Sequence, residues 1–118
     1  MRRVEKPWGH EEVWAETDRY VGKILHIRAH RRLSLQHHVV KDETIRVLSG
    51  RMVLELDDAN GVLSARTLGP GDVARIRPGQ RHRFAALEDC DVLEVSTPEL
   101  EDVVRHEDDY GRSGTTGA

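Results

Sequence analysis

The sequence has a single cysteine, Cys90, and no long apolar segment. One thiol cannot form a disulfide within the chain, and such sparse cysteine is typical of a reducing compartment. Residues 1–13 lack the apolar stretch of a secretory signal, and no run elsewhere is long enough to cross a bilayer. We therefore expect a cytoplasmic protein with no membrane partner.

An excess of charge of either sign is also missing. The formal net charge of the 118-residue chain is -3, and the charged residues, 33% of the sequence, mix both signs without a long block of either. Its short cationic stretches, such as residues 28–32, are not interleaved with aromatic residues, which make up only 4% of the sequence. A nucleic-acid surface needs concentrated positive charge and stacking rings, so we expect no nucleic-acid partner.

Helical periodicity is scarce as well, whereas short β-rich runs recur between turn sequences. A length of 118 residues fits one domain. Regular strands separated by tight turns predict an all-β fold, a small antiparallel sandwich or barrel. The expected strands cover residues 11–15, 21–28, 33–37, 43–49, 51–57, 62–68, 72–77, 82–87 and 91–96.

The pattern changes after residue 97. Pro98 followed by acidic residues predicts a short C-terminal helix that ends before His106, because proline and acids favour the first turn of a helix. We expect residues 1–112 to form the domain. Residues 113–118, which consist mainly of glycine, serine and threonine, are expected to form a flexible tail.

Four side chains with metal-binding chemistry lie at the ends of expected strands. Gln36 and His38 point to the same side because side chains alternate along an extended segment, and Glu43 begins the next strand. A Pro-Gly turn at residues 78–79 delivers His82 to the start of a later strand. Two imidazoles, a carboxylate and a carboxamide oxygen suit a divalent first-row metal with open coordination positions. We predict that these four residues are metal ligands.

The other histidines are expected to play smaller parts. His37 lies between two predicted ligands and should face away from them, although a β-bulge would bring it into the site. We interpret His10, His26, His30 and His106 as surface or hydrogen-bonded residues.

The spacing of the predicted ligands resembles the two motifs of the cupin superfamily. The first motif reads Gln36, His37 and His38, four residues, Glu43, six residues and Gly50, with Gln36 standing where most cupins have a histidine. The second motif reads Gly71 and Asp72, then Pro78 and Gly79, two residues and His82. The resemblance implies a single-domain cupin, a small antiparallel β-barrel or jelly roll with the metal inside it.

Further stretches resemble one branch of the cupins, the type II mannose-6-phosphate isomerase domain at the C-terminus of bacterial bifunctional enzymes. That family holds zinc with a glutamine, two histidines and a glutamate. The similar stretches are residues 6–9, 20–24 and 32–36 and a C-terminal signature over residues 101–112, so the resemblance spans roughly residues 5–112. Val39, Val40 and Arg46 depart from the family's pattern and leave the identity of the sugar open.

This resemblance implies a metal-dependent aldose–ketose isomerase that acts on a sugar or sugar phosphate. Zinc is the expected metal, with manganese, iron and nickel as alternatives. Lys23 is expected to be the base or a phosphate contact. Arg105 is expected to be catalytic and, together with Arg112, to bind the substrate phosphate. Because small open barrels leave sheet edges that pairing can cover, we also expect a homodimer.

Two other functions fit the same residues. An iron-dependent dioxygenase would use His38, Glu43 and His82 as a triad of two histidines and one carboxylate. A non-catalytic module that binds a sugar or small anion is the other alternative, because the nucleotidyltransferase domain of the bifunctional enzymes is absent from this sequence.

Overall fold

The structure, a computed structural model, describes residues 1–112, which form strands and no helix. The strands are β1 (Arg2–Lys6), β2 (Gly9–Glu16), β3 (Val21–Ile27), β4 (Leu35–His37), β5 (Glu43–Ser49), β6 (Met52–Asp57), β7 (Leu63–Leu68), β8 (Val73–Ile76), β9 (His82–Ala86), β10 (Cys90–Ser96) and β11 (Val104–Glu107). The predicted all-β class is therefore confirmed.

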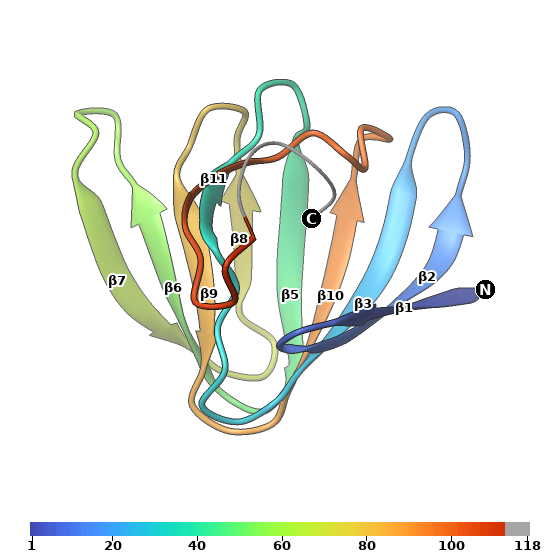
Figure 1. The fold of residues 1–118 in the computed structure, drawn as a ribbon, viewed down its shortest axis with the longest axis horizontal. Helices are drawn as coiled ribbons and strands as arrows, with labels where there is room; N and C mark the ends of the chain where they lie inside the picture. Colours follow the sequence, from blue (N-terminus) through green and yellow to red (C-terminus); the bar gives the residue numbers. More distant parts are fainter. Residues whose placement is uncertain (113–118) are drawn as a thin grey trace.

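The strands form two sheets. The six-stranded sheet has the order β1-β2-β3-β10-β5-β8, and the five-stranded sheet has the order β11-β4-β9-β6-β7. Every pair of neighbouring strands within them is antiparallel. Figure 1 shows the strands of both sheets converging toward one end, while the C-terminal segment returns along β4.

The hydrophobic core lies between the two sheets. Its central side chains are Ile45, Val47 and Val92 from the six-stranded sheet and Met52, Leu54 and Phe84 from the five-stranded sheet. At one end of the six-stranded sheet, the inward positions hold charged residues instead of apolar ones. These residues are Lys23, Glu43 and Glu94. The interior therefore has an apolar part that stabilises the fold and a polar part at one end.

All nine predicted strands are present, with ends that differ by at most two residues. Two strands, β1 and β11, were not predicted from the sequence. β1 has the sequence RRVEK, in which four charged residues leave no alternation of apolar and polar positions. It lies at the edge of its sheet, where charged side chains discourage pairing with other chains. β11 forms only because it pairs with β4, which is distant in the sequence.

The predicted C-terminal helix is wrong. Residues 98–101 form a turn in which the Leu100 amide donates to the Pro98 carbonyl, and the chain then extends into β11. A helix of so few residues is unstable on its own. Burial of Val103, which is 1% exposed, and pairing of β11 with β4 favour the extended form instead.

The predicted flexible tail, residues 113–118, lies outside the described residues. In residues 1–112 there is no helix long and apolar enough to cross a membrane.

Candidate metal centre

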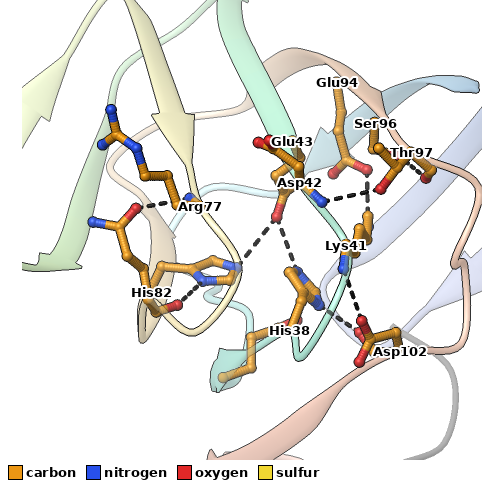
Figure 2. A network of polar contacts seen from close by, with 12 residues as sticks. His38, Lys41, Asp42, Glu43, Arg77, His82, Glu94, Ser96, Thr97 and Asp102 are labelled. Carbon is orange, nitrogen blue, oxygen red and sulfur yellow. Dashed lines mark hydrogen bonds and ion pairs between the residues drawn. The ribbon is translucent and has the colours of Figure 1, made fainter.

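Three of the four predicted ligands meet inside the molecule. Oε1 of Glu43 lies 3.0 Å from Nε2 of His38 and 3.4 Å from Nε2 of His82. All three side chains are buried, and Figure 2 shows them pointing toward one another from separate segments of the chain. A tetrahedral metal shell with bonds of about 2.1 Å places neighbouring ligand atoms about 3.4 Å apart. The spacing of His38, Glu43 and His82, which we call the donor cluster, therefore fits a divalent ion.

Hydrogen bonds fix the orientation of both imidazoles. Nδ1 of His38 donates to the Asp102 carbonyl at 2.5 Å, and Nδ1 of His82 donates to the Gln80 carbonyl at 2.9 Å. Each Nε2 is thereby directed toward Glu43. This is the arrangement found around metal-binding histidines, whose second nitrogen is held by a carbonyl or carboxylate. A metal would take the place of the contacts between these Nε2 atoms and Glu43, with each Nε2 binding the ion in its deprotonated form.

Local structure explains why these residues converge. His38 directly follows β4, whereas Glu43 and His82 are the first residues of β5 and β9. Gly79, in the turn before β9, has a φ of 85°, which favours glycine. Its amide donates to the His38 carbonyl at 2.7 Å, so the turn that presents His82 is anchored to the loop that presents His38.

Gln36, the fourth predicted ligand, lines the same cavity as the three. It lies opposite His82 in the pairing of β4 with β9 and is buried. Its Nε2 donates to the Ser34 hydroxyl at 2.8 Å, so Oε1 is the atom that would bind a metal. His37, as expected, lies outside this group, with Nδ1 2.8 Å from Nε2 of His106.

Asp102 anchors the loop between β4 and β5. Its carboxylate accepts hydrogen bonds from the backbone amides of Val39, Val40 and Lys41 at 2.7–3.0 Å. Its backbone carbonyl holds His38. Burial raises the pKa of Asp102, but the three amide hydrogen bonds outweigh burial and the pKa lies below its ordinary value. Asp102 therefore stabilises the loop mainly in its charged form.

We expect Asp102→Ala to lower the free energy of unfolding by about 2 kcal/mol at pH 7, because three amides lose a charged acceptor. The lowered pKa means that this contribution is present above about pH 4 and is lost as the pH falls through the folded-state value. Urea unfolding of both proteins at pH 7 and in acid measures it. A gap between them that stayed constant with pH would contradict this account.

A buried lysine lies next to the three donors. Lys41 is 1% exposed, and its Nζ lies 3.2 Å from Oε2 of Glu94. Burial raises the pKa of Glu43, but Lys41 and hydrogen bonds from both imidazoles outweigh it and hold the pKa well below its ordinary value. Burial and the neighbouring Glu43 raise the pKa of Glu94 to about 7, against the opposing effect of Lys41 and Lys23. The site thus pairs an ionised carboxylate with one that titrates near neutrality.

The predicted catalytic residue Lys23 lines the same cavity. It is 3% exposed, and its Nζ lies 3.3 Å from Oε1 of Glu11. Lys23 is paired with Glu94 in the register of β3 and β10. The interior therefore holds a row of acidic and basic side chains that alternate, beginning at Glu43. We call it the charged row, and its members are Glu43, Lys41, Glu94, Lys23 and Glu11.

The cavity at this site is small. Its volume is about 20 Å³, and Trp8, Leu25 and Phe84 contribute apolar walls beside the polar residues. Such a volume holds an ion or a water molecule. A separate surface groove of about 210 Å³ is lined by Lys6, Leu100 and Glu101, among others. Glu11 and Lys23 line both spaces, so their ion pair lies between the groove and the cavity.

The two predicted phosphate-binding arginines lie on the C-terminal segment. Arg112 lines the cavity and forms an ion pair with Asp108 at 3.0 Å. Arg105 lies on β11 opposite Gln36 and does not line the cavity. Burial lowers the pKa of Arg105, and the nearby Arg112 lowers it further. Both arginines are thus close to the site, and Arg112 reaches it.

Lys6 joins this group of cations. Burial lowers the pKa of Lys6, and Lys23, Arg112 and Arg105 lower it further, against the opposing effect of Glu11. The positive charges of Lys23, Arg105 and Arg112 therefore lie near that of Lys6. The sequence reasoning did not assign Lys6 a role, although it lies in the residues 6–9 that carried the family resemblance.

The sequence reasoning also missed Lys41, Glu94, Glu11 and Asp102. A signal existed for Glu94, since it alternates with Val92 and Ser96 at inward positions of a strand. Lys41 and Asp102 lie in irregular segments, and there the sequence carries no such periodicity.

Solved structures with the same fold include three proteins of different size. KdgF from Halomonas sp. is 21% identical, with a TM-score of 0.74 over 84% of this chain and 89% of that one. The capsular polysaccharide assembling protein CapF from Staphylococcus aureus is 20% identical, with a TM-score of 0.71 over 86% of this chain. Oxalate decarboxylase from Bacillus subtilis, which has Mn(II) centres, is 15% identical, with a TM-score of 0.74 over 88% of this chain.

The present chain spans only 29% of the length of CapF and 29% of that of oxalate decarboxylase. No curated protein matches it. The family model described as "Cupin domain" matches residues 24–96, a span that holds the donor cluster and both motifs. The chain therefore belongs to the cupin domain family.

Proposed function

We propose that this protein is a metal-dependent isomerase that interconverts the aldose and ketose forms of a sugar phosphate. The observation that carries the proposal is the convergence of His38, Glu43 and His82 on a cavity that also contains the charged row. The resemblance of residues 6–9 and 101–112 to the mannose-6-phosphate isomerase domain supports the substrate class. Zinc is the metal that we expect.

Isomerisation of this kind moves a proton between adjacent carbons. A divalent ion held by His38, Glu43, His82 and Gln36 would polarise the carbonyl and hydroxyl oxygens of the substrate. A general base works best when its pKa lies near the operating pH. Glu94, with a pKa of about 7, meets this requirement and is our candidate base.

We propose that Lys23 binds the substrate and does not act as the base. Its Nζ lies 3.3 Å and 3.4 Å from the two carboxylate oxygens of Glu11, where it acts as a donor. An ammonium group at the wall between groove and cavity is placed to donate to a substrate oxygen or phosphate. We therefore propose that Lys23 orients the substrate and that Glu94 moves the proton.

The cations Lys6, Lys23, Arg105 and Arg112 supply the charge needed for the phosphate. Guanidinium groups bind phosphate through paired hydrogen bonds, and clustered positive charge lowers the free energy of a bound dianion. Arg112 is held by Asp108 at 3.0 Å, so a phosphate would replace that carboxylate as its partner.

Substrate binding requires part of the wall to move, because a cavity of about 20 Å³ is too small for a sugar phosphate. The C-terminal segment contributes Arg112 to the cavity and Leu100 and Glu101 to the groove. Residues 108–112 are held by Tyr110, which packs against the core, and by ion pairs such as that of Arg32 with Asp109 at 2.6 Å, which is exposed. We propose that the sugar lies in the groove and reaches the metal when this segment shifts.

The direct test is an isomerase assay. Protein stripped with a chelator and reloaded with Zn²⁺, Mn²⁺, Fe²⁺ or Ni²⁺ would be assayed with mannose 6-phosphate and with other hexose and pentose phosphates. We expect turnover that appears on reloading. Oxygen consumption by the Fe²⁺ form without isomerisation would favour a dioxygenase, and binding of sugar phosphate without any turnover would favour a binding module; both results contradict the proposal.

Arg112→Ala is expected to raise KM for the sugar phosphate by about 10- to 100-fold, the effect of losing one charged contact to phosphate. The value of kcat should change less, because the proton-transfer residues remain in place. Steady-state kinetics measure both constants. Arg51→Ala is the matched control, because Arg51 is exposed in the turn after β5, away from the cavity. Equal effects of the two substitutions would contradict the assignment.

A further inference from the structure

A second group of histidines and carboxylates lies on the outer face of the six-stranded sheet. His10 and Glu12 are two residues apart on β2 and share one face of the strand. His26 on β3 is paired directly with His10, and Asp91 on β10 is paired directly with His26. These side chains point away from the cavity, because the inward face of β3 is occupied by Lys23 and its apolar neighbours.

The ligand atoms of three of these residues lie close together. Nε2 of His26 is 3.2 Å from Oε1 of Glu12, and Nε2 of His10 is 4.0 Å from the same oxygen. The rings of His10 and His26 stack with centroids 4.3 Å apart. Among the described residues, His10, Glu12 and His26 form one of two groups whose potential ligand atoms all lie within 4.8 Å of one another. The other group is the interior one.

Asp91 orients His26 as a metal ligand. Nδ1 of His26 donates to Oδ1 of Asp91 at 2.6 Å, so Nε2 is the nitrogen directed at Glu12. That Nε2 is shielded from solvent and has no hydrogen-bond partner of good geometry. A carboxylate that holds one imidazole nitrogen while the other faces a second carboxylate is the arrangement around zinc-binding histidines.

His10 supplies the second imidazole of the group, and its side chain is only 21% exposed. The outer group therefore offers two imidazoles and one carboxylate, the set found where zinc keeps an open position.

We propose that His10, Glu12 and His26 bind a divalent ion of the zinc class, with Asp91 as the residue that positions His26. The site is separate from the interior one and does not depend on the isomerase proposal. A neighbouring groove of about 270 Å³ is lined by His10, His26, Arg3 and Arg28, among others. The open position of the ion faces solvent on this side of the sheet. The ion would also join β2 to β3, since its ligands come from both strands.

The test is a count of bound zinc ions by isothermal titration calorimetry and elemental analysis. We expect two Zn²⁺ per chain for the natural protein, one for His10→Ala, one for His82→Ala and none for the double variant. Glu12→Gln keeps the size of the side chain and should weaken the outer site by at least about tenfold. Titration with Co²⁺ should give an absorption band that His82→Ala retains and that requires at least about tenfold more Co²⁺ when Glu12→Gln is added to His82→Ala.

A different outcome separates the two proposals. If His82→Ala removes all bound metal and His10→Ala removes none, the outer site does not exist and the interior site stands. If His82→Ala changes nothing and His10→Ala removes the ion, the outer site stands and the interior one fails. Urea unfolding of each metal-free variant checks that the change in metal content does not come from loss of the fold.

Discussion

Replacing His82 with alanine is expected to remove metal from the interior site and to lower the kcat/KM of sugar-phosphate isomerisation about 1000-fold or more. Nε2 of His82 lies 3.4 Å from Oε1 of Glu43, and it is one of the three ligand atoms of that donor group. The remaining donors would bind the ion weakly, and the substrate oxygens would lose their polarising partner.

His106→Ala is the matched control for this substitution. His106 lies on β11 and contacts His37 rather than the donor cluster. We expect it to retain metal and activity at close to natural levels. Elemental analysis after dialysis, followed by steady-state kinetics, measures both effects. Full metal content at the interior site of His82→Ala, with unchanged kinetics, would mean that His82 is not a ligand.

Lys41→Met is expected to lower the free energy of unfolding of the metal-free protein by about 3–5 kcal/mol. Lys41 is 1% exposed, and its ammonium is the cation between Glu43 and Glu94, both of which are nearly inaccessible. Without it, two carboxylates remain buried with no compensating charge on that side. The Glu94 carboxyl would then be protonated over a wider pH range, because the cation that lowers its pKa is gone.

Urea unfolding in the presence of a chelator measures this effect. Adding Glu94→Gln to Lys41→Met should recover part of the lost stability, because the substitution removes one of the uncompensated charges. Arg75→Met is the surface control: Arg75 pairs with Asp42 at 2.7 Å in an exposed position, and its loss should leave the unfolding midpoint nearly unchanged. Equal effects of Lys41→Met and Arg75→Met would show that the charged row does not stabilise the interior.

The strands that could be predicted are those whose signal is local. β5 and β10, for example, alternate buried and exposed residues with a period of two and end at recognisable turns. β1 carries four charged residues out of five, and β11 follows a proline and acids that favour a helix. Both are edge strands, so their structure depends on pairing with a partner that no local pattern reveals.

The same distinction applies to the site. The meeting of Gln36, His38, Glu43 and His82 at one cavity was predictable because their spacing along the chain places them at strand ends, although these strands belong to two different sheets. Lys41 gave no such signal, since a lysine next to an aspartate in a loop is ordinarily exposed. Its burial depends on Glu94, which lies far away in the sequence. Contacts between an irregular segment and a distant strand depend on the whole fold, so the local sequence does not predict them.

The most direct test of the central claim is anomalous diffraction, at the absorption edge of the metal, from crystals grown with a divalent zinc salt. The account predicts a peak within about 2.0–2.3 Å of Nε2 of His38, Nε2 of His82 and a carboxylate oxygen of Glu43. A map without a peak between these three residues, from a protein that has taken up zinc elsewhere, would contradict it.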